Sequence, residues 1–318
     1  MLEQTDLTLT LAKKAYHQIV PLQMERLLEL ERLVYERKTP VIMVFEGWDA
    51  AGKGTTIRKL TERLDPRGFK VLPTNAPRTH ERQKPWLWRF WMQIPRHGQI
   101  AIFDRSWYGR VLVERVEGLT PVPEWIRAYE EINAFERTLA ADHTVFIKCW
   151  LHISKAEQLR RFLYLSQQPE LAWQVAAEDW EHHRNYDEYL AAVRDMITNT
   201  STPVAPWTVV PATDANYRTY FVFRTLIERL EQALGVEPMT WPDVDQLDGQ
   251  PADAKSQGKN KQPPPAKQAL DKKKATKKLD KKKDKKTAQK AAKKAKKEAK
   301  KKQRAPSAAT VESVVDHA

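Results

Sequence analysis

Short apolar runs recur along the chain up to position 236, separated by longer stretches with apolar residues at helical spacing. Each run is rich in β-branched or aromatic residues and too short for a helix, so it predicts a buried strand. The predicted strands are 41–45, 69–73, 99–104, 144–151 and 206–210. The predicted helices are 55–64, 123–141, one that begins at Ser154, 177–196 and 217–234. This alternation predicts an α/β fold, a five-stranded parallel sheet with helices on both faces.

The chain before the first strand has an apolar pattern of its own. Residues 9–37 carry apolar side chains at roughly helical spacing, interrupted near Pro21. Because proline removes a backbone donor inside a helix, this pattern predicts a helical hairpin or a kinked helix that packs beside the first strand. We therefore assign an N-terminal helical segment, 1–38, and a core domain, 39–236.

Charge divides the chain into two parts. Residues 251–318 hold 23 Lys and Arg against 7 Asp and Glu, whereas residues 1–250 hold 31 against 34. The formal net charge of +13 therefore comes from the C-terminal part. Residues 237–265 have the Pro, Gln, Asp and Gly content of a linker. Residues 266–318 form a Lys-rich low-complexity tail with almost no aliphatic side chains to bury, so we expect it to be disordered.

The tail suggests a function of its own. A dense run of lysines attracts polyanions such as polyphosphate or nucleic acid through counterion release. One interpretation is therefore a protein that acts through this tail by binding a polyanion. The simpler alternative is a tail that only keeps the protein soluble.

Composition also bears on the compartment. The chain has one cysteine, Cys149, so no intrachain disulfide can form, which suits a reducing cytoplasm. The first residues lack the basic start and apolar run of a signal peptide, and no run of roughly 18 apolar residues follows. We expect a cytoplasmic protein that does not bind membranes.

The first strand leads into a glycine-rich loop that carries the first candidate chemistry. Gly47, Gly52 and Lys53 match the pattern G-x-x-x-x-G-K-[ST] up to its last position, where Gly54 replaces the hydroxyl that normally binds Mg²⁺. Glycines let backbone N–H groups converge on an anion, and the following helix adds the positive end of its dipole. Asp49 adds a carboxylate in mid-loop. The other residues assigned to phosphate binding here are Ala50, Ala51 and Thr55. We interpret the loop as a phosphate site with an altered metal ligand, in a P-loop kinase fold.

An acidic residue ends the strand at 99–104. Asp104 in this position, about fifty residues after a phosphate loop, predicts a second ligand for Mg²⁺. Arg105 and Arg110 follow it and are candidate planar donors to phosphate. Arg78 comes after the second strand, at the sheet edge where ligands bind in open α/β sheets, and is a further candidate.

The helix that begins at Ser154 is expected to form part of a helical lid over residues 153–200. Ser154 and Glu157 match a capping box, in which Glu157 reaches back to the first backbone N–H. Arg160 and Arg161 follow on this helix, where a lid arginine covers the transferring phosphoryl group in kinase-like folds. A solvated basic face is the alternative for both. Further along, His182 and His183 are adjacent on a helix, so they cannot chelate one metal together, and we expect them on the surface.

The stretches GWDAAGKG, DRSWYGR and SKAEQLRRF resemble the polyphosphate kinase 2 family, and the likeness extends over about 41–234. The resemblance implies reversible, Mg²⁺-dependent phosphoryl transfer from inorganic polyphosphate to a nucleotide, in a homo-oligomer (dimer or tetramer). It implies that Asp49 and Asp104 manage the metal and the acceptor phosphate. The positions that it assigns to phosphate and nucleotide binding are Lys53, Arg105, Arg160 and Arg161, with Arg78, Arg110 and Glu114 as helpers.

The residues after DRSWY are similar to those of family members that phosphorylate AMP to ADP, so AMP is the expected acceptor. ADP, with ATP as the product, and guanine nucleotides (GMP, GDP) are alternatives. One departure stands out: the family often has lysines near positions 214–216, and this chain has none. Either the polyphosphate contact at these positions is missing in this chain, or it shifts to the tail. The rival on the same fold is an ATP-dependent nucleotide kinase, against which Gly54 argues.

Overall fold

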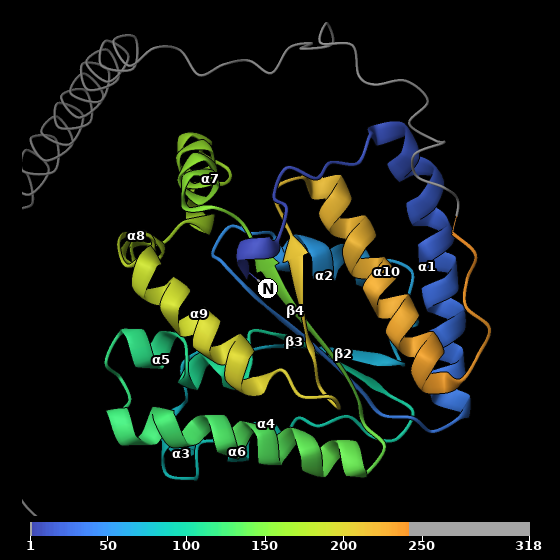
Figure 1. Ribbon diagram of the computed structural model, residues 1–318, viewed down its shortest axis with the longest axis horizontal. Coiled ribbons are helices and arrows are strands. Elements are labelled where there is room, and N and C mark those ends of the chain that lie inside the picture. Colours follow the sequence, from blue (N-terminus) through green and yellow to red (C-terminus); the bar gives the residue numbers. More distant parts are fainter. Residues whose placement is uncertain (1, 242–318) are drawn as a thin grey trace, which may run out of the picture. The chain divides into compact units, whose positions relative to one another are not determined.

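A parallel sheet of five strands forms the centre of the protein, in the order β2-β3-β1-β4-β5 (Figure 1). The structure is a computed structural model that describes residues 2–241. The strands are β1 (Val41–Gly47), β2 (Phe69–Pro73), β3 (Ile100–Asp104), β4 (Val145–His152) and β5 (Trp207–Pro211). All five lie where the apolar runs predicted them, to within about two residues at each end. The α/β fold and the parallel sheet are confirmed.

Strand β1 occupies the middle of the sheet and is the most deeply buried. Val41 pairs with Ile100 of β3 on one side and with Val145 of β4 on the other. The first six residues of β1 are all buried. Because all strands are parallel, the carboxyl end of β1 opens between those of β3 and β4, at the edge where ligands bind in such sheets.

Helices cover both faces of the sheet, with α1 and α10 on one side and α6 and α9 on the other (Figure 1). The longer helices are α1 (Lys13–Glu36), α2 (Lys53–Thr61), α6 (Val122–Ala141), α7 (Lys155–Gln167), α8 (Ala177–Arg184), α9 (Tyr186–Thr200) and α10 (Ala215–Leu234). The short ones are α3 (Thr79–Arg82), α4 (Trp88–Trp91) and α5 (Val113–Val116), with single 3₁₀ turns η1 (Leu2–Gln4), η2 (Trp107–Arg110) and η3 (Ala172–Gln174).

Two helix predictions can be compared with the structure. Of the two forms expected for the N-terminal segment, a hairpin or a kinked helix, the hairpin is wrong, because the segment is one helix, α1, with Pro21 inside it. Buried residues on both sides of the proline, such as Val20 and Met24, keep the helix docked despite the lost hydrogen bond. The predicted helix 177–196 is two helices that meet at Asn185. Helix α9 has a buried apolar face, whereas α8 buries none of its residues, so packing on the core does not require the two to be collinear.

One ion pair lies wholly inside the core. The Nζ of Lys148 on β4 lies 2.8 Å from Oε2 of Glu136 on α6, and both side chains are fully buried. Lys148 also donates to the hydroxyl of Tyr108 at 2.6 Å and to the carbonyl of Thr200 at 2.9 Å. The other oxygen of Glu136 accepts from Tyr108 and from Trp107. Every charge in this cluster therefore has its full set of partners.

The predicted tail, 266–318, and nearly all of the predicted linker, 237–265, lie outside the described residues. The disorder and polyanion binding expected of the tail stay predictions. Within residues 2–241, no helix combines the length and the apolar character that crossing a bilayer requires.

Candidate active site

The segment between β1 and α2, residues 47–54, forms a tight loop that we call the phosphate loop. Its backbone adopts positive φ at Gly47 (149°), Ala50 (59°) and Gly52 (100°). A Cβ at Gly47 would lie 2.5 Å from the carbonyl oxygen of Leu151, so only glycine fits this close approach to β4. Ala50 has no such freedom, and its left-handed conformation is a strained feature of the kind that gathers at functional sites.

The loop leaves several backbone donors free. Among the described residues, the N–H groups of Asp49, Ala50 and Gly52 donate to no backbone carbonyl. Helix α2 begins directly afterwards, so the N–H groups of its first turn also lack partners within the helix. Converging N–H groups at the positive end of a helix form an anion site. The predicted phosphate loop therefore has the geometry that phosphate binding needs.

Lys53 folds back over this loop. Its Nζ donates to the carbonyls of Gly47 at 2.6 Å and of Trp48 at 3.1 Å. Burial lowers the pKa of Lys53, and the negative charge of Asp49 opposes that shift. The ammonium group is held by carbonyl oxygens and forms no ion pair within residues 2–241, so its charge remains available to an anionic ligand.

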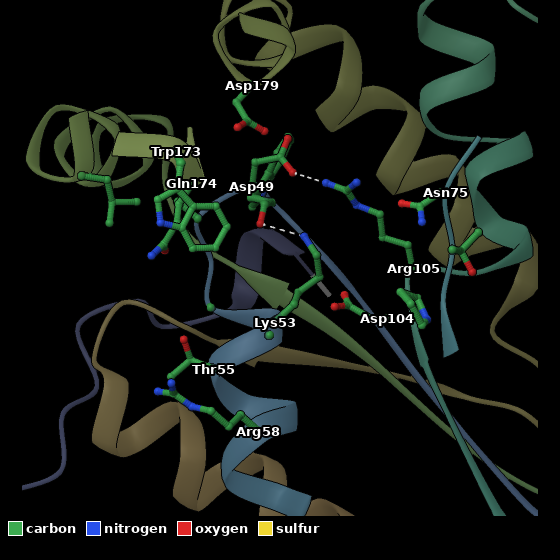
Figure 2. A pocket seen from close by; sticks show the side chains of 17 residues that line it. Asp49, Lys53, Thr55, Arg58, Asn75, Asp104, Arg105, Trp173, Gln174 and Asp179 are labelled. Atoms are coloured by element: carbon green, nitrogen blue, oxygen red, sulfur yellow. Dashed lines mark hydrogen bonds and ion pairs between the residues drawn. The ribbon is translucent and has the colours of Figure 1, made fainter. Parts of the chain in front are cut away.

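Asp49 is the most heavily engaged residue of the loop. Its Oδ1 accepts from Nη2 of Arg105 at 2.8 Å (Figure 2). Its Oδ2 lies 2.7 Å from Nδ1 of His182. Burial alone would raise the pKa of Asp49, but the hydrogen bond from His182 and the charges of Lys53 and Arg105 outweigh it and hold that pKa well below its usual range. Asp49 is therefore ionised at neutral pH.

Arg105 reaches Asp49 from the end of β3. Its backbone has φ of 60°, and its N–H donates to the carbonyl of Phe45 at 3.1 Å. The side chain is about half exposed, at 53%. A strained backbone thus turns an accessible guanidinium toward the phosphate loop.

His182 was missed by the sequence reasoning, and the prediction that it lies on the surface is wrong. It sits on α8 with only 20% of its side chain exposed, and its Nε2 lies 2.8 Å from Oε1 of Glu117. The hydrogen bond to Asp49 raises the pKa of His182, with help from Glu117. His183 faces elsewhere, toward Gln158, so the two histidines do not share a ligand, as expected.

A cavity of about 700 Å³ opens in front of the phosphate loop, and we call it the loop cavity. It is within the usual size range of ligand pockets. Figure 2 shows side chains entering it from four directions. Its polar and charged lining includes Asp49, Lys53, Thr55, Arg58, Asn75, Asp104, Arg105, Gln174 and Asp179. The structure thus brings together all four predicted catalytic residues, Asp49, Lys53, Asp104 and Arg105, and the loop positions Ala50, Gly52, Gly54 and Thr55.

The candidate metal ligands in the loop cavity differ from the predicted pair, Asp49 and Asp104. Ligand atoms of Asp49, Asp179 and His182 lie within 4.8 Å of one another, and they are the group that could hold a metal ion among the described residues. Asp104 faces the same cavity without joining this group. Mg²⁺ takes carboxylate oxygens and water in preference to imidazole, so Asp49 and Asp179 suit it better than His182 does.

The predicted lid arginines have a different position from the one expected. Ser154 caps α7 by accepting from the N–H of Glu157 at 3.1 Å, but the Glu157 carboxylate pairs with Arg160 and Arg161 and does not reach back. Arg161 donates to the carbonyls of Ala50, Ala212 and Thr213, each at 2.8 Å. Neither arginine lines the loop cavity. Arg161 ties the phosphate loop to the end of β5 through its bonds to these carbonyls.

Two further cavities contain the other predicted binding residues, Arg78, Arg110 and Glu114. Arg78 lines a cavity of about 170 Å³ that shares Asn75 with the loop cavity. Arg110 and Glu114 form an ion pair at 2.9 Å and line a further cavity of about 400 Å³. The guanidinium of Arg110 also lies 4.9 Å from the ring centre of Trp86. These three residues are near the site, but they do not touch the phosphate loop.

The lining residues that sequence reasoning overlooked come from α2 and from the lid. Arg58 lies one turn into α2, where a cation close to a phosphate loop is a signal that could have been used. Trp173, Gln174 and Asp179 come from η3 and α8, more than a hundred positions after the loop. No local pattern marks these three, because their role depends on how the lid folds over the sheet.

The chain is similar to proteins of a known family. Residues 10–237 match the family model described as polyphosphate kinase 2. Over 233 residues the chain is 44% identical to "Polyphosphate:AMP phosphotransferase" of Pseudomonas aeruginosa, which covers 73% of this chain and 47% of that protein. It is 40% identical over 207 residues to "AMP/ADP-polyphosphate phosphotransferase" of Meiothermus ruber, covering 65% and 78%.

A solved structure gives the same fold. The crystal structure of polyphosphate kinase 2 from Arthrobacter aurescens superposes with a TM-score of 0.71 at 29% identity and covers 77% of this chain and 90% of that one. The chain spans about half the length of the Pseudomonas relative that it matches.

Proposed function

The chain belongs to the polyphosphate kinase 2 family, and from that premise we propose that it transfers a phosphoryl group between inorganic polyphosphate and a nucleotide, with AMP as the preferred acceptor. In the forward direction the terminal P–O–P bond of polyphosphate breaks, a new P–O bond forms to a phosphate oxygen of AMP, and ADP and shortened polyphosphate leave. The same site would run the reverse reaction, and ADP is a second acceptor candidate.

The observation that carries this proposal is the convergence of Asp49, Lys53 and Arg105 at one cavity. Phosphoryl transfer requires mainly alignment and charge neutralisation, with little covalent chemistry from the protein. Lys53 offers an unpaired ammonium and Arg105 an accessible guanidinium to the phosphates of the donor. The helix start at Gly54 has no hydroxyl, and a loop carboxylate replaces it, which favours a donor other than ATP.

Arg105 links the loop to the substrate. It now pairs with Asp49, and a polyphosphate chain in the loop cavity would compete for its donors. The exchange would free Oδ1 of Asp49, whereas Oδ2 would keep its hydrogen bond with His182. Mg²⁺ would then be held by Asp49 together with substrate phosphates, with Asp104 and Asp179 as further carboxylates in the same cavity. A bound Mg²⁺ would supply neutralisation of the charge that builds up on the transferring group.

The acceptor has room on the β2 side of the loop cavity. The cavity that contains Arg78 shares Asn75 with the loop cavity. It shares Glu81 and Arg89 in turn with the cavity that contains Trp86 and Arg110. They offer aromatic rings together with arginines, which suits a nucleoside monophosphate better than a bare polyanion. The names of the relatives, which specify AMP, or AMP and ADP, support the same acceptor.

The lid would keep water from the reacting phosphates. Trp173 and Gln174 of η3 and Asp179 of α8 line the loop cavity opposite the sheet (Figure 2). His182 holds the lid to the loop through Asp49. Exclusion of water matters here because water competes with AMP for the phosphoryl group.

Incubation of the protein with polyphosphate and Mg²⁺, separately with AMP and with ADP and without ATP, tests the proposal. We expect ADP to accumulate from AMP, with less or slower formation of ATP from ADP. A Lys53→Ala variant is the control for contaminating kinases. Phosphorylation of AMP by ATP but not by polyphosphate would refute the proposal in favour of an ordinary nucleotide kinase.

We also propose a cytoplasmic location. Cys149 is free and buried, and burial raises the pKa of its thiol to about 12, so it is unreactive and needs no oxidised partner. This suits a reducing compartment.

A further inference from the structure

A buried arginine lies directly against Gly52 of the phosphate loop; it does not line the loop cavity but borders a second cavity, of about 720 Å³, beside α2 and α10. Arg218 is in the first turn of α10 and is only 4% exposed. Its Nη1 donates to the carbonyl of Ala51 at 3.1 Å. A Cβ at Gly52 would lie 2.3 Å from this Nη1, so the missing side chain of Gly52 is the space that the guanidinium occupies. Gly52 also lines the loop cavity, so one residue separates Arg218 from the ligand space.

The charge of Arg218 has no acidic partner within residues 2–241. Its Nε is buried without a hydrogen-bond partner. The nearest acid along the chain, Asp214, accepts instead from the backbone N–H groups of Tyr217 and Leu11. Burial and the neighbouring Arg161 lower the pKa of Arg218 to about 10, against the opposing charge of Asp214, so the guanidinium still carries its charge at neutral pH. A buried cation without a paired carboxylate is costly, and such a cost persists where something else compensates it.

Arg161 and Arg218 act on consecutive carbonyl groups. Arg161 holds the oxygen of Ala50, and Arg218 holds the oxygen of Ala51. The N–H of Gly52 is in the same peptide plane as the Ala51 carbonyl and points the opposite way. With that carbonyl held at the back of the loop, this N–H, which has no carbonyl partner among the described residues, is left for the front. Arg161 forms an ion pair with Glu157, whereas Arg218 forms none within residues 2–241. The two arginines therefore share a mechanical role, but only Arg218 brings a charge without a paired carboxylate.

We propose that Arg218 is a positioning residue of the phosphate loop, which orients the loop through the Ala51 carbonyl and supplies, across Gly52, the positive charge that balances phosphate bound in the loop cavity. It does not touch the substrate. The proposal goes beyond the phosphoryl transfer proposed above and rests on it only for the identity of the anion, an inorganic polyphosphate.

Two substitutions separate the two parts of this role. Arg218→Gln removes the charge and leaves a shorter polar side chain, and Arg218→Lys keeps the charge and loses the planar guanidinium. Arg224→Gln is the matched control, because Arg224 is on the same helix but is 45% exposed and paired with Glu228. The full-length chain is titrated with tripolyphosphate by calorimetry, without nucleotide. A Lys53→Ala variant measures the binding that does not involve the loop, including any to the lysine-rich tail.

We expect Arg218→Gln to weaken loop-dependent tripolyphosphate binding about tenfold or more, the size of one lost charge-assisted interaction. Arg218→Lys should stay within about threefold of the wild type, and Arg224→Gln should match the wild type. In turnover, Arg218→Gln should raise the KM for polyphosphate more than it lowers kcat. The ligand-free melting temperature shows whether each variant is folded.

Wild-type affinity in a folded Arg218→Gln protein overturns the proposal, as does an Arg218→Lys protein that binds as weakly as Arg218→Gln. If Arg218→Gln does not fold, Arg218→Lys decides, and a tenfold loss in that variant overturns the role of the charge. The titration requires no turnover. A wild type that binds tripolyphosphate through Lys53 but phosphorylates no nucleotide would therefore refute the proposed function while leaving Arg218 testable.

Discussion

Two sets of buried charges lie close to β1 and β4, and they are satisfied in opposite ways. In the core cluster, Lys148 and Glu136 are fully buried and form an ion pair at 2.8 Å. Glu136 also accepts from Tyr108 and Trp107, and Lys148 donates to the Tyr108 hydroxyl and to the Thr200 carbonyl. At the phosphate loop, Lys53 donates only to carbonyls, and Arg218 has no acidic partner among the described residues.

The difference separates a structural role from a functional one. Charges that satisfy one another leave nothing for a ligand, and their removal affects the fold. Cations that carbonyl oxygens hold in place keep most of their charge for an incoming anion. Burial by itself therefore does not identify the functional residues of this protein. They are identified by buried cations at the phosphate loop that have no paired carboxylate among the described residues.

Lys53→Ala and Asp49→Asn are the strongest test of this comparison. We expect each to lower turnover at least about a thousandfold, the order of loss seen when a positioned charge is removed from an active site, and to leave the protein folded. Turnover is measured with polyphosphate and AMP, and folding by circular dichroism. Near-normal activity in either folded variant would contradict the assignment of the site.

Lys148→Met, in the core cluster, should instead lower the stability of the fold. It leaves Glu136 buried without its cation, which costs about 3–5 kcal/mol of unfolding free energy. Urea unfolding measures this loss. Replacing Glu136 as well, in Lys148→Met with Glu136→Leu, should recover part of it. If the single variant were as stable as the wild type, the core cluster would not be the structural element inferred here.

Glu31 on α1 should make the stability of the fold depend on pH, because it is a buried carboxylate that forms no ion pair within residues 2–241. It is 4% exposed, its Oε2 accepts from the N–H of Asp65 at 2.8 Å, and its Oε1 has no partner. Burial raises the pKa of Glu31 to about 7. The folded-state pKa lies above the unfolded one, so the stability from its protonated form is complete below about pH 4.5 and is lost as the pH rises to about 7.

Glu31→Gln should remove this dependence. Above pH 7 the variant should be more stable than the wild type by up to about 3 kcal/mol, and the two should converge at low pH. Urea unfolding between pH 4.5 and 8 measures the difference. Parallel pH profiles for the two proteins would mean that Glu31 is already ionised in the folded state at low pH.

Gly54→Ala should have the smallest effect. A Cβ at this position meets no atom within 4 Å, and the residue lies in the first turn of α2. We expect the unfolding free energy to rise by up to about 1 kcal/mol, because alanine suits a helix better than glycine. Turnover should stay within a few-fold of the wild type. A large loss of turnover in the folded variant would show that the substrate uses the open space beside Gly54.

The sequence alone determined the fold and the centre of the site. The buried strands and the loop from Gly47 to Gly54 are encoded by residues that are neighbours in the chain, so apolar runs and glycine spacing are enough to find them. Asp104 and Arg105 could be added because parallel strands end at one edge of the sheet.

The tertiary structure alone decided which charges serve the loop. His182 and Asp49 are separated by 133 positions, and Arg218 and Ala51 by 167. For the same reason Arg161 holds backbone carbonyls and does not enter the cavity. A charged residue looks the same in sequence whether it is paired, solvated or buried behind a phosphate site. Its partner in space determines its role, and only the folded chain brings that partner close.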